Sequence, residues 1–272
     1  MAERNIKAAV VGAAGRMGQR IINLIAQTEG IELRGAIERP DHPLLGKEIE
    51  VYTGLNKFPV KLTDDLKKIL PEIDVVIDFS EAKNTLLNIE AINIEKKAAV
   101  IGTTGFSPTE AEELKRKLKG IPCVFSPNMS IGVNLMFKVI GYIAQILKDD
   151  FEVEIIEAHH RMKKDAPSGT AVRLAEIIAK SLDRDLNRVG IYGRKGIIGE
   201  RKTQEIGIHA VRAGDIVGEH TVLFAGFGER IEVIHRAHSR DTFARGAVKA
   251  ALWIVDQPPG IYGMEDVLGL HD

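Results

Sequence analysis

The chain has 272 residues, of which 44% are hydrophobic and 28% charged, and its formal net charge at pH 7 is −1. This length suits one large domain or two modest ones, and the balanced charge gives no general electrostatic reason to bind nucleic acid or an anionic membrane. No apolar run approaches the roughly 20 residues that span a bilayer, and the N-terminus lacks the hydrophobic segment of a signal peptide. The single cysteine, Cys123, excludes an intrachain disulfide and a cysteine-rich metal site. We therefore expect a cytoplasmic protein with no nucleic-acid or membrane partner.

The first half of the chain alternates short apolar segments with helical patterns. Strands are expected at residues 6–11, 31–37, 75–79, 98–101 and 122–125, and helices at residues 16–27, 64–70, 83–96 and 108–118. Short, continuously apolar strands that alternate with helices are typical of a parallel sheet covered on both faces. The predicted fold class of this half is therefore α/β, with a Rossmann-like parallel sheet.

The pattern changes after a long amphipathic helix expected at residues 130–147. A strand, a helix and a polar loop or lid rich in glycine and arginine follow, at residues 151–158, 171–182 and 183–203. Three strands that read as antiparallel come next, at residues 205–212, 217–225 and 230–237, with a hairpin turn at 226–229 and a final helix at 241–255. This part of the chain therefore predicts an α+β unit with a mostly antiparallel sheet.

A glycine-rich turn between the first strand and the first helix is the first candidate binding site. Gly12, Gly15 and Gly18 are spaced three residues apart, so the backbone can approach a pyrophosphate at the helix N-terminus. Glu38 closes the second strand, where an acid can bind ribose hydroxyls, and Arg39 beside it can meet a 2′-phosphate. The pattern favours a dinucleotide site, and the alternative is a tight turn that only packs helix on sheet.

Two further loops follow strands that should end at the same edge of the sheet. They are Gly102-Thr103-Thr104-Gly105 and Ser126-Pro127-Asn128-Met129. Ligands of open parallel sheets bind outside the carboxyl ends of the strands, so these loops are expected to border the nicotinamide half of a cofactor. The alternative is the ordinary chemistry of strand-to-helix turns.

The segment from Glu157 to Thr170 combines two histidines, two lysines and the start of a helix. Adjacent residues of a strand point to opposite faces, so His159 and His160 are not expected to share a metal ion. Histidine, and lysine tuned by burial, both suit general acid catalysis. The helix start at residues 167–170 offers free N–H groups to a carboxylate. The segment favours a pocket in which a small carboxylate is protonated, and the alternative is a solvated loop with an N-cap.

These motifs together resemble the 4-hydroxy-tetrahydrodipicolinate reductase family, also called dihydrodipicolinate reductase. The resemblance covers the whole chain and is carried by residues 11–18, 102–105, 126–134, 157–171, 235–237 and 240–244. The run His-His-x-x-Lys-x-Asp-Ala-Pro-Ser-Gly-Thr is its most specific part. The resemblance implies NADH- or NADPH-dependent reduction of a cyclic imine dicarboxylate in lysine and diaminopimelate biosynthesis, with hydride added at C4.

The resemblance also implies an organisation and a set of roles. A dinucleotide-binding domain would comprise residues 1–129 and 240–272, and residues 130–239 would bind substrate and form a homotetramer. His159 would be the general acid/base and Lys163 the proton donor, and no metal would be needed. The residues that would hold the substrate carboxylates are His160, Ser168, Gly169 and Thr170. Those that would contact the cofactor are Gly12, Ala13, Ala14, Gly15, Arg16, Met17, Glu38, Arg39, Gly102, Thr103, Thr104, Ser126, Pro127, Asn128 and Met129.

Two other functions are compatible with the residues alone. One is a different two-domain dehydrogenase that acts on aspartate semialdehyde or homoserine. An acylating enzyme of that kind would need a nucleophilic cysteine, and Cys123 lies in the middle of a predicted strand. The other is a non-catalytic NAD(P)-sensing protein. The choice between NADH and NADPH stays open at this point.

Overall fold

The computed structural model describes residues 5–271, and these residues fall into two compact units. The first unit comprises Met1–Ile131 with Arg240–Asp272, and the second comprises Gly132–Ser239. The chain therefore leaves the first unit once and returns to it for its last segment. The binding role expected for each unit stays a prediction.

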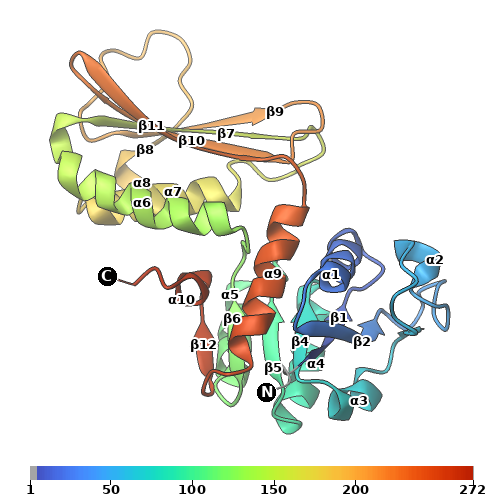
Figure 1. Cartoon of the computed structure of the whole chain (residues 1–272). Helices are drawn as coiled ribbons and strands as arrows, with labels where there is room; N and C mark the ends of the chain where they lie inside the picture. Colours follow the sequence, from blue (N-terminus) through green and yellow to red (C-terminus); the bar gives the residue numbers. More distant parts are fainter. Residues whose placement is uncertain (1–4, 272) are drawn as a thin grey trace. The chain divides into compact units, whose positions relative to one another are not determined.

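The first unit contains a seven-stranded parallel sheet in the order β12-β6-β5-β4-β1-β2-β3 (Figure 1). Its strands are β1 (Ile6–Val11), β2 (Ile31–Ile37), β3 (Leu62–Thr63), β4 (Val75–Asp78), β5 (Ala98–Ile101), β6 (Pro122–Phe125) and β12 (Gly260–Tyr262). The predicted α/β class and the five predicted strands of this half are confirmed. The sequence pattern missed β3 and β12, because segments of two or three residues show no periodicity.

Helices cover both faces of this sheet. They are α1 (Arg16–Gln27), α2 (Glu50–Thr53), α3 (Leu66–Ile69), α4 (Ala82–Ile94), α5 (Pro108–Leu118), α9 (Asp241–Ile254) and α10 (Met264–Leu268), with a 3-10 turn η1 (Leu70–Glu72). Ile21 of α1 and Ala247 of α9 are buried in one hydrophobic core, and Ile89 of α4 and Leu114 of α5 in another. Burial on both faces explains why these strands are continuously apolar.

Helix α9 packs unusually close to the segment that follows β6. A Cβ atom on Gly246 would lie 1.7 Å from the carbonyl oxygen of Met129, so a larger residue there would force the backbone apart. Met129 itself is buried. The last segment of the chain therefore fixes the backbone of a loop that the sequence singles out for cofactor binding.

The second unit has a five-stranded sheet in the order β11-β10-β7-β9-β8 (Figure 1). Helices α6 and α7 pack on one of its faces around a single apolar cluster. The elements are α6 (Ile131–Leu147), η2 (Lys148–Asp150), β7 (Glu152–His159), α7 (Gly169–Ser181), α8 (Leu186–Val189), β8 (Gly190–Tyr192), β9 (Ile206–Arg212), β10 (Gly218–Gly226) and β11 (Glu229–Ala237). Most of the paired residues belong to β7–β10 and β10–β11, which are antiparallel, and this confirms the mostly antiparallel sheet.

Two details of this unit differ from the sequence prediction. Strand β9 runs parallel to β7 and to β8 because a long connection separates it from each: the segment that starts with α7 lies between β7 and β9, and residues 193–205 lie between β8 and β9. The expected loop at residues 183–203 also contains α8 and β8, and β8 pairs with β9, which lies outside that loop. Neither the β7–β9 pairing nor the β8–β9 pairing produces a periodic pattern in the sequence of these short strands.

Helix α6 with η2, Ile131–Asp150, is the one described segment long and apolar enough to cross a membrane by length and composition. Within the second unit, however, Met136, Ile140 and Ala144 of this helix lie in the hydrophobic core with residues of α7 and the sheet. The composition of α6 is therefore accounted for by packing on at least one of its sides.

Candidate active site

The glycine-rich turn lies at the carboxyl edge of the parallel sheet. Gly12 has a φ of 75°, which favours glycine, and its N–H donates to the carbonyl oxygen of Ile37 at 2.9 Å. A Cβ atom on Gly18 would lie 2.1 Å from the carbonyl oxygen of Gly12, so glycine is required for α1 to begin this close to the turn. Gly15 is the N-cap of α1, and no described side chain caps this helix. Its first N–H groups are therefore available to an anion.

Glu38 and Arg39 lie beside this turn, at the end of β2. One carboxylate oxygen of Glu38 accepts the N–H of Ala14 at 3.2 Å, and the other accepts the N–H of Arg39 at 3.2 Å. The exposed guanidinium of Arg39 pairs with Asp41 at 3.1 Å. The structure thus brings the predicted ribose-binding acid and its basic neighbour to the glycine-rich turn.

The two further loops lie at the same edge of the sheet. The N–H of Gly102 donates to Asp78 at 3.0 Å, and the N–H of Ser126 donates to Ile101 at 3.2 Å. Thr103 is buried, and its hydroxyl donates to the side chain of Asp78 at 3.2 Å. The Ser126 hydroxyl donates to the carbonyl oxygen of Asn128 at 2.9 Å. The loops that contain the predicted cofactor residues therefore follow β1, β2, β5 and β6 at one edge of the sheet.

In the second unit, β7 ends at His159, His160 follows directly, and α7 begins at the end of the same motif. Ser168 is the N-cap of α7, and its hydroxyl accepts the N–H of Ala171 at 3.2 Å. A Cβ atom on Gly169 would meet nothing within 4 Å, so the start of the helix faces open space. This arrangement places the N-terminus of α7 where a carboxylate was expected.

Glu157 joins the histidine to this helix start. Its carboxylate is fully buried and lies 2.6 Å from Nδ1 of His159. It also accepts the N–H of Ser168 at 2.9 Å and two N–H groups of Arg212 at 2.7 and 2.8 Å. Burial alone would raise the pKa of Glu157, but the hydrogen bonds from Arg212, His159 and Ser168 outweigh it and hold the pKa below its usual value. Glu157 is therefore ionised at neutral pH.

His159 lies in a largely desolvated environment. Burial lowers its pKa, although the adjacent Glu157 acts in the opposite direction. The ring of His220 contacts it edge to face, with centroids 5.3 Å apart. Burial lowers the pKa of His220 to about 3, so this second imidazole is neutral, and its Nε2 lies 3.2 Å from the Ser168 hydroxyl.

Lys163 and His160 occupy the loop between β7 and α7. The Lys163 ammonium pairs with Asp165 at 2.9 Å. The N–H of His160 donates to Ile216 at 2.7 Å, which fixes the start of the loop. The loop is also held by Arg212, which donates to the carbonyl oxygen of Asp165 at 2.7 Å. Among residues 5–271, no three His, Cys, Asp or Glu side chains form a group suited to a metal ion.

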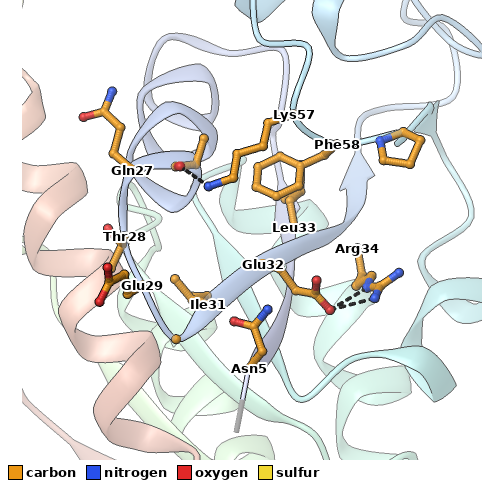
Figure 2. Close-up of a pocket in the computed structure, with 13 residues that line it drawn as sticks. Asn5, Gln27, Thr28, Glu29, Ile31, Glu32, Leu33, Arg34, Lys57 and Phe58 are labelled. Atoms are coloured by element: carbon orange, nitrogen blue, oxygen red, sulfur yellow. Dashed lines mark hydrogen bonds and ion pairs between the residues drawn. The ribbon is translucent and has the colours of Figure 1, made fainter. Parts of the chain in front are cut away.

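A large open cavity elsewhere in the first unit contains none of these residues. It has a volume of about 710 Å³ and lies between the end of α1, the start of β2 and residues 57–59 (Figure 2). The Lys57 ammonium donates there to the carbonyl oxygen of Ala26, and Arg34 pairs with Glu32 at 2.7 Å. Open α/β sheets bind ligands at the opposite, carboxyl ends of their strands, so this cavity is not the candidate site.

Comparison with known families decides between the possible dehydrogenases. Residues 6–129 match the family model of the dihydrodipicolinate reductase N-terminus, and residues 132–268 match that of the dihydrodipicolinate reductase C-terminus. The chain belongs to the dihydrodipicolinate reductase family. The resemblance stated from the motifs is therefore confirmed.

Full-length relatives agree with this membership. The chain is 54% identical over 265 residues to the 4-hydroxy-tetrahydrodipicolinate reductase of Syntrophobacter fumaroxidans, covering 97% of this chain and 99% of that protein. The enzyme of the same name from Geotalea daltonii gives the same identity and coverage. Among solved structures, dipicolinate-bound dihydrodipicolinate reductase from Paenisporosarcina sp. TG-14 is similar, with a TM-score of 0.73, 26% identity and coverage of 95% and 97% of the two chains.

Four residues that the structure places around the candidate site were not predicted from the sequence motifs. Glu157 opened the motif but received no role, and Asp78, Arg212 and His220 were not considered. Asp78 and Glu157 carry a usable signal, because an acid inside an apolar strand requires buried partners. Arg212 and His220 carry none, since their partners lie 55 and 52 residues away in the chain.

The same structure removes the acylating alternative. Cys123 is fully buried in β6, and burial together with nearby Asp78 raises the pKa of its thiol far above neutrality. A thiol in that state is neither ionised nor accessible. Cys123 is thus a core residue.

We predict that Arg212→Gln destabilises the protein by about 3–5 kcal/mol, because it leaves the fully buried Glu157 without its cationic partner. Urea unfolding at neutral pH measures the change. Arg194→Gln is the matched control, since Glu154 is 17% exposed and keeps a bond from Arg201 at 3.0 Å. Losses below about 1 kcal/mol in both variants would contradict the predicted dependence on Arg212.

Proposed function

We propose that this chain reduces 4-hydroxy-tetrahydrodipicolinate to tetrahydrodipicolinate with NADH or NADPH, a step of lysine and diaminopimelate biosynthesis. Membership of the dihydrodipicolinate reductase family over both halves of the chain carries the proposal. The geometry at the end of β7 supports it, because the imidazole of His159 and the N-cap residue of α7 both bind one carboxylate. Such a pair can bind an anion and exchange a proton beside it.

The carboxyl edge of the parallel sheet suits the dinucleotide. The uncapped start of α1 offers N–H groups to the pyrophosphate, and the half-buried Glu38 carboxylate is placed for ribose hydroxyls. The exposed Arg39 can exchange Asp41 for a 2′-phosphate, which supports use of both cofactors. The loops that begin at Gly102 and Ser126 complete the edge. When bound, the reduced nicotinamide supplies the hydride.

The second unit supplies the groups that bind and protonate the substrate. Ser168, Gly169 and Thr170 surround the N-terminus of α7 and hold a substrate carboxylate, with His160 assisting from the end of β7. His159 lies at the end of β7, and Lys163 lies on the loop that follows. Either can donate a proton to the substrate atoms on which charge develops. Fixing these groups before the reaction lowers the entropy cost of reaching the transition state.

Oxidation of NADH and of NADPH with freshly generated 4-hydroxy-tetrahydrodipicolinate tests the proposed reaction directly. We expect absorbance loss at the nicotinamide wavelength with both cofactors, dependent on substrate and enzyme. The controls are mixtures without substrate and mixtures in which aspartate semialdehyde replaces it. Nucleotide binding without oxidation would reject the reductase and favour a sensor.

His159→Gln and Lys163→Ala are expected to lower kcat by roughly 10²–10⁴, since each removes a group proposed to handle a proton. NADH affinity should stay within about twofold of the wild type, because neither residue belongs to the first unit. Steady-state kinetics and fluorescence titration with NADH give the two quantities. Full turnover in both variants would disprove the acid/base assignment.

Assembly as a cytoplasmic homotetramer is part of the same proposal. The face of the second sheet opposite α6 and α7 exposes Ile156, Val211 and Ile234, which are 42%, 44% and 42% accessible. Exposed β-branched residues on a sheet face are typical of a surface covered by another subunit. Light scattering coupled to gel filtration should give four times the 29.9 kDa chain mass. A stable monomer at micromolar concentration would contradict it.

A further inference from the structure

The two oxygens of the Glu157 carboxylate have different partners. Oε2 lies 2.6 Å from Nδ1 of His159, and Oε1 accepts the N–H of Ser168 at 2.9 Å. The Arg212 guanidinium bridges both oxygens at 2.7 and 2.8 Å. Both oxygens are therefore fully used, and the carboxyl plane is fixed from three directions.

This geometry determines which nitrogen of His159 carries the proton. An ionised carboxylate accepts hydrogen bonds but cannot donate them, so Nδ1 must be the protonated nitrogen in the neutral ring. Nε2 is then the atom that gains or loses a proton. A Cβ atom on Gly218 would lie 3.1 Å from Nε2, so a larger residue there would crowd this nitrogen.

The same carboxylate also controls the start of α7. Its bond to the N–H of Ser168 fixes the residue whose hydroxyl caps the helix at its first turn. Any shift of Glu157 would therefore move the imidazole and the proposed carboxylate site relative to each other.

We propose that Glu157 is a positioning residue: it holds His159 as the Nδ1–H tautomer, leaves Nε2 to exchange the proton, and keeps that ring in register with Ser168. This inference rests on the proposed reductase function for its kinetic consequences. Its structural part, the tautomer, stands without it. Arg212 acts through Glu157 by keeping the carboxylate ionised.

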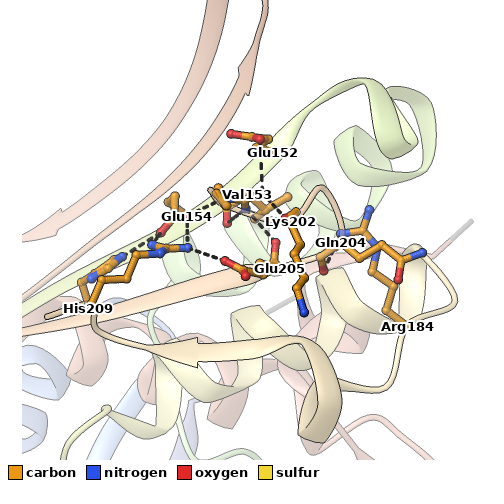
Figure 3. Close-up of polar contacts among 10 residues, drawn as sticks. Glu152, Val153, Glu154, Arg184, Lys202, Gln204, Glu205 and His209 are labelled. Carbon is orange, nitrogen blue, oxygen red and sulfur yellow. Dashed lines mark hydrogen bonds and ion pairs between the residues drawn. The ribbon is translucent and has the colours of Figure 1, made fainter. Parts of the chain in front are cut away.

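The chain contains a matched control three residues earlier on the same strand. Glu154 lies on the other face of β7, where Arg194 binds both of its oxygens at 2.9 Å and His209 Nε2 lies 2.7 Å away (Figure 3). Arg201 adds a third contact at 3.0 Å. Glu154 thus has the same kinds of partners as Glu157, but it contacts no residue proposed to bind or protonate substrate.

The first test compares the pH profiles of kcat for Glu157→Gln and Glu154→Gln. Removing the charge of Glu157 destabilises the imidazolium, so the pKa of His159 falls and the limb that reports it moves to lower pH. We expect kcat to fall on the order of a hundredfold in Glu157→Gln, with little change in Glu154→Gln. Glu157→Asp, which keeps the charge, should return the limb toward its original pH. The charged or titratable groups that face His159 are Glu157, Lys163, Arg212 and His220.

An unshifted limb in Glu157→Gln, or equal shifts in both glutamine variants, would overturn the inference. Wild-type turnover is measured in parallel, because its absence would reject the reductase function and leave the tautomer untouched. Nitrogen-15 NMR of histidine-labelled wild-type protein then decides that point, even if Glu157→Gln fails to fold. We expect a protonated Nδ1 on neutral His159, and a protonated Nε2 with a bare Nδ1 would overturn the proposal.

Discussion

The buried charge of Glu157 is the constraint on which the candidate site depends. A carboxylate with no exposure to water is tolerated when each oxygen has partners, and those partners come from β7, β9 and the residue that caps α7. These segments can satisfy it in a single arrangement. The requirement that stabilises the second unit is therefore also the requirement that places the imidazole beside the helix start.

The first unit achieves the same end by a different means. The loops predicted to bind cofactor lie together because adjacent parallel strands all end at one edge, and close packing then fixes these loops. Gly18 against Gly12, and Gly246 against Met129, are contacts where the absence of a side chain sets the distance between backbones. Backbone geometry thus defines the candidate site of the first unit, whereas charge defines that of the second.

Local pattern was sufficient for most of this architecture but not for its long-range pairing. The alternation of apolar strands and helices, the glycine-rich turn and the capped start of α7 are all encoded within short windows, and the structure confirms these elements. The predicted antiparallel pairing of β9 was wrong, because the direction of a strand relative to its neighbour depends on the connection between them and not on the strand's own residues. Arg212 and His220 were not predicted as site residues for a related reason: each acquires its role from a partner more than 50 residues away.

The balance of charges around His159 explains why a buried acid alone would not allow the imidazole to exchange a proton. An unpaired carboxylate in contact with an imidazole would favour the protonated ring so strongly that the proton would seldom leave. Burial disfavours the imidazolium, and the charges of Lys163 and Arg212 oppose that of Glu157, so the pKa of His159 lies below its ordinary value despite the acid at 2.6 Å. The neutral His220 beside it adds no competing charge. The ring is thus held in place by a strong hydrogen bond, while the surrounding charges keep it able to gain a proton and to lose it again.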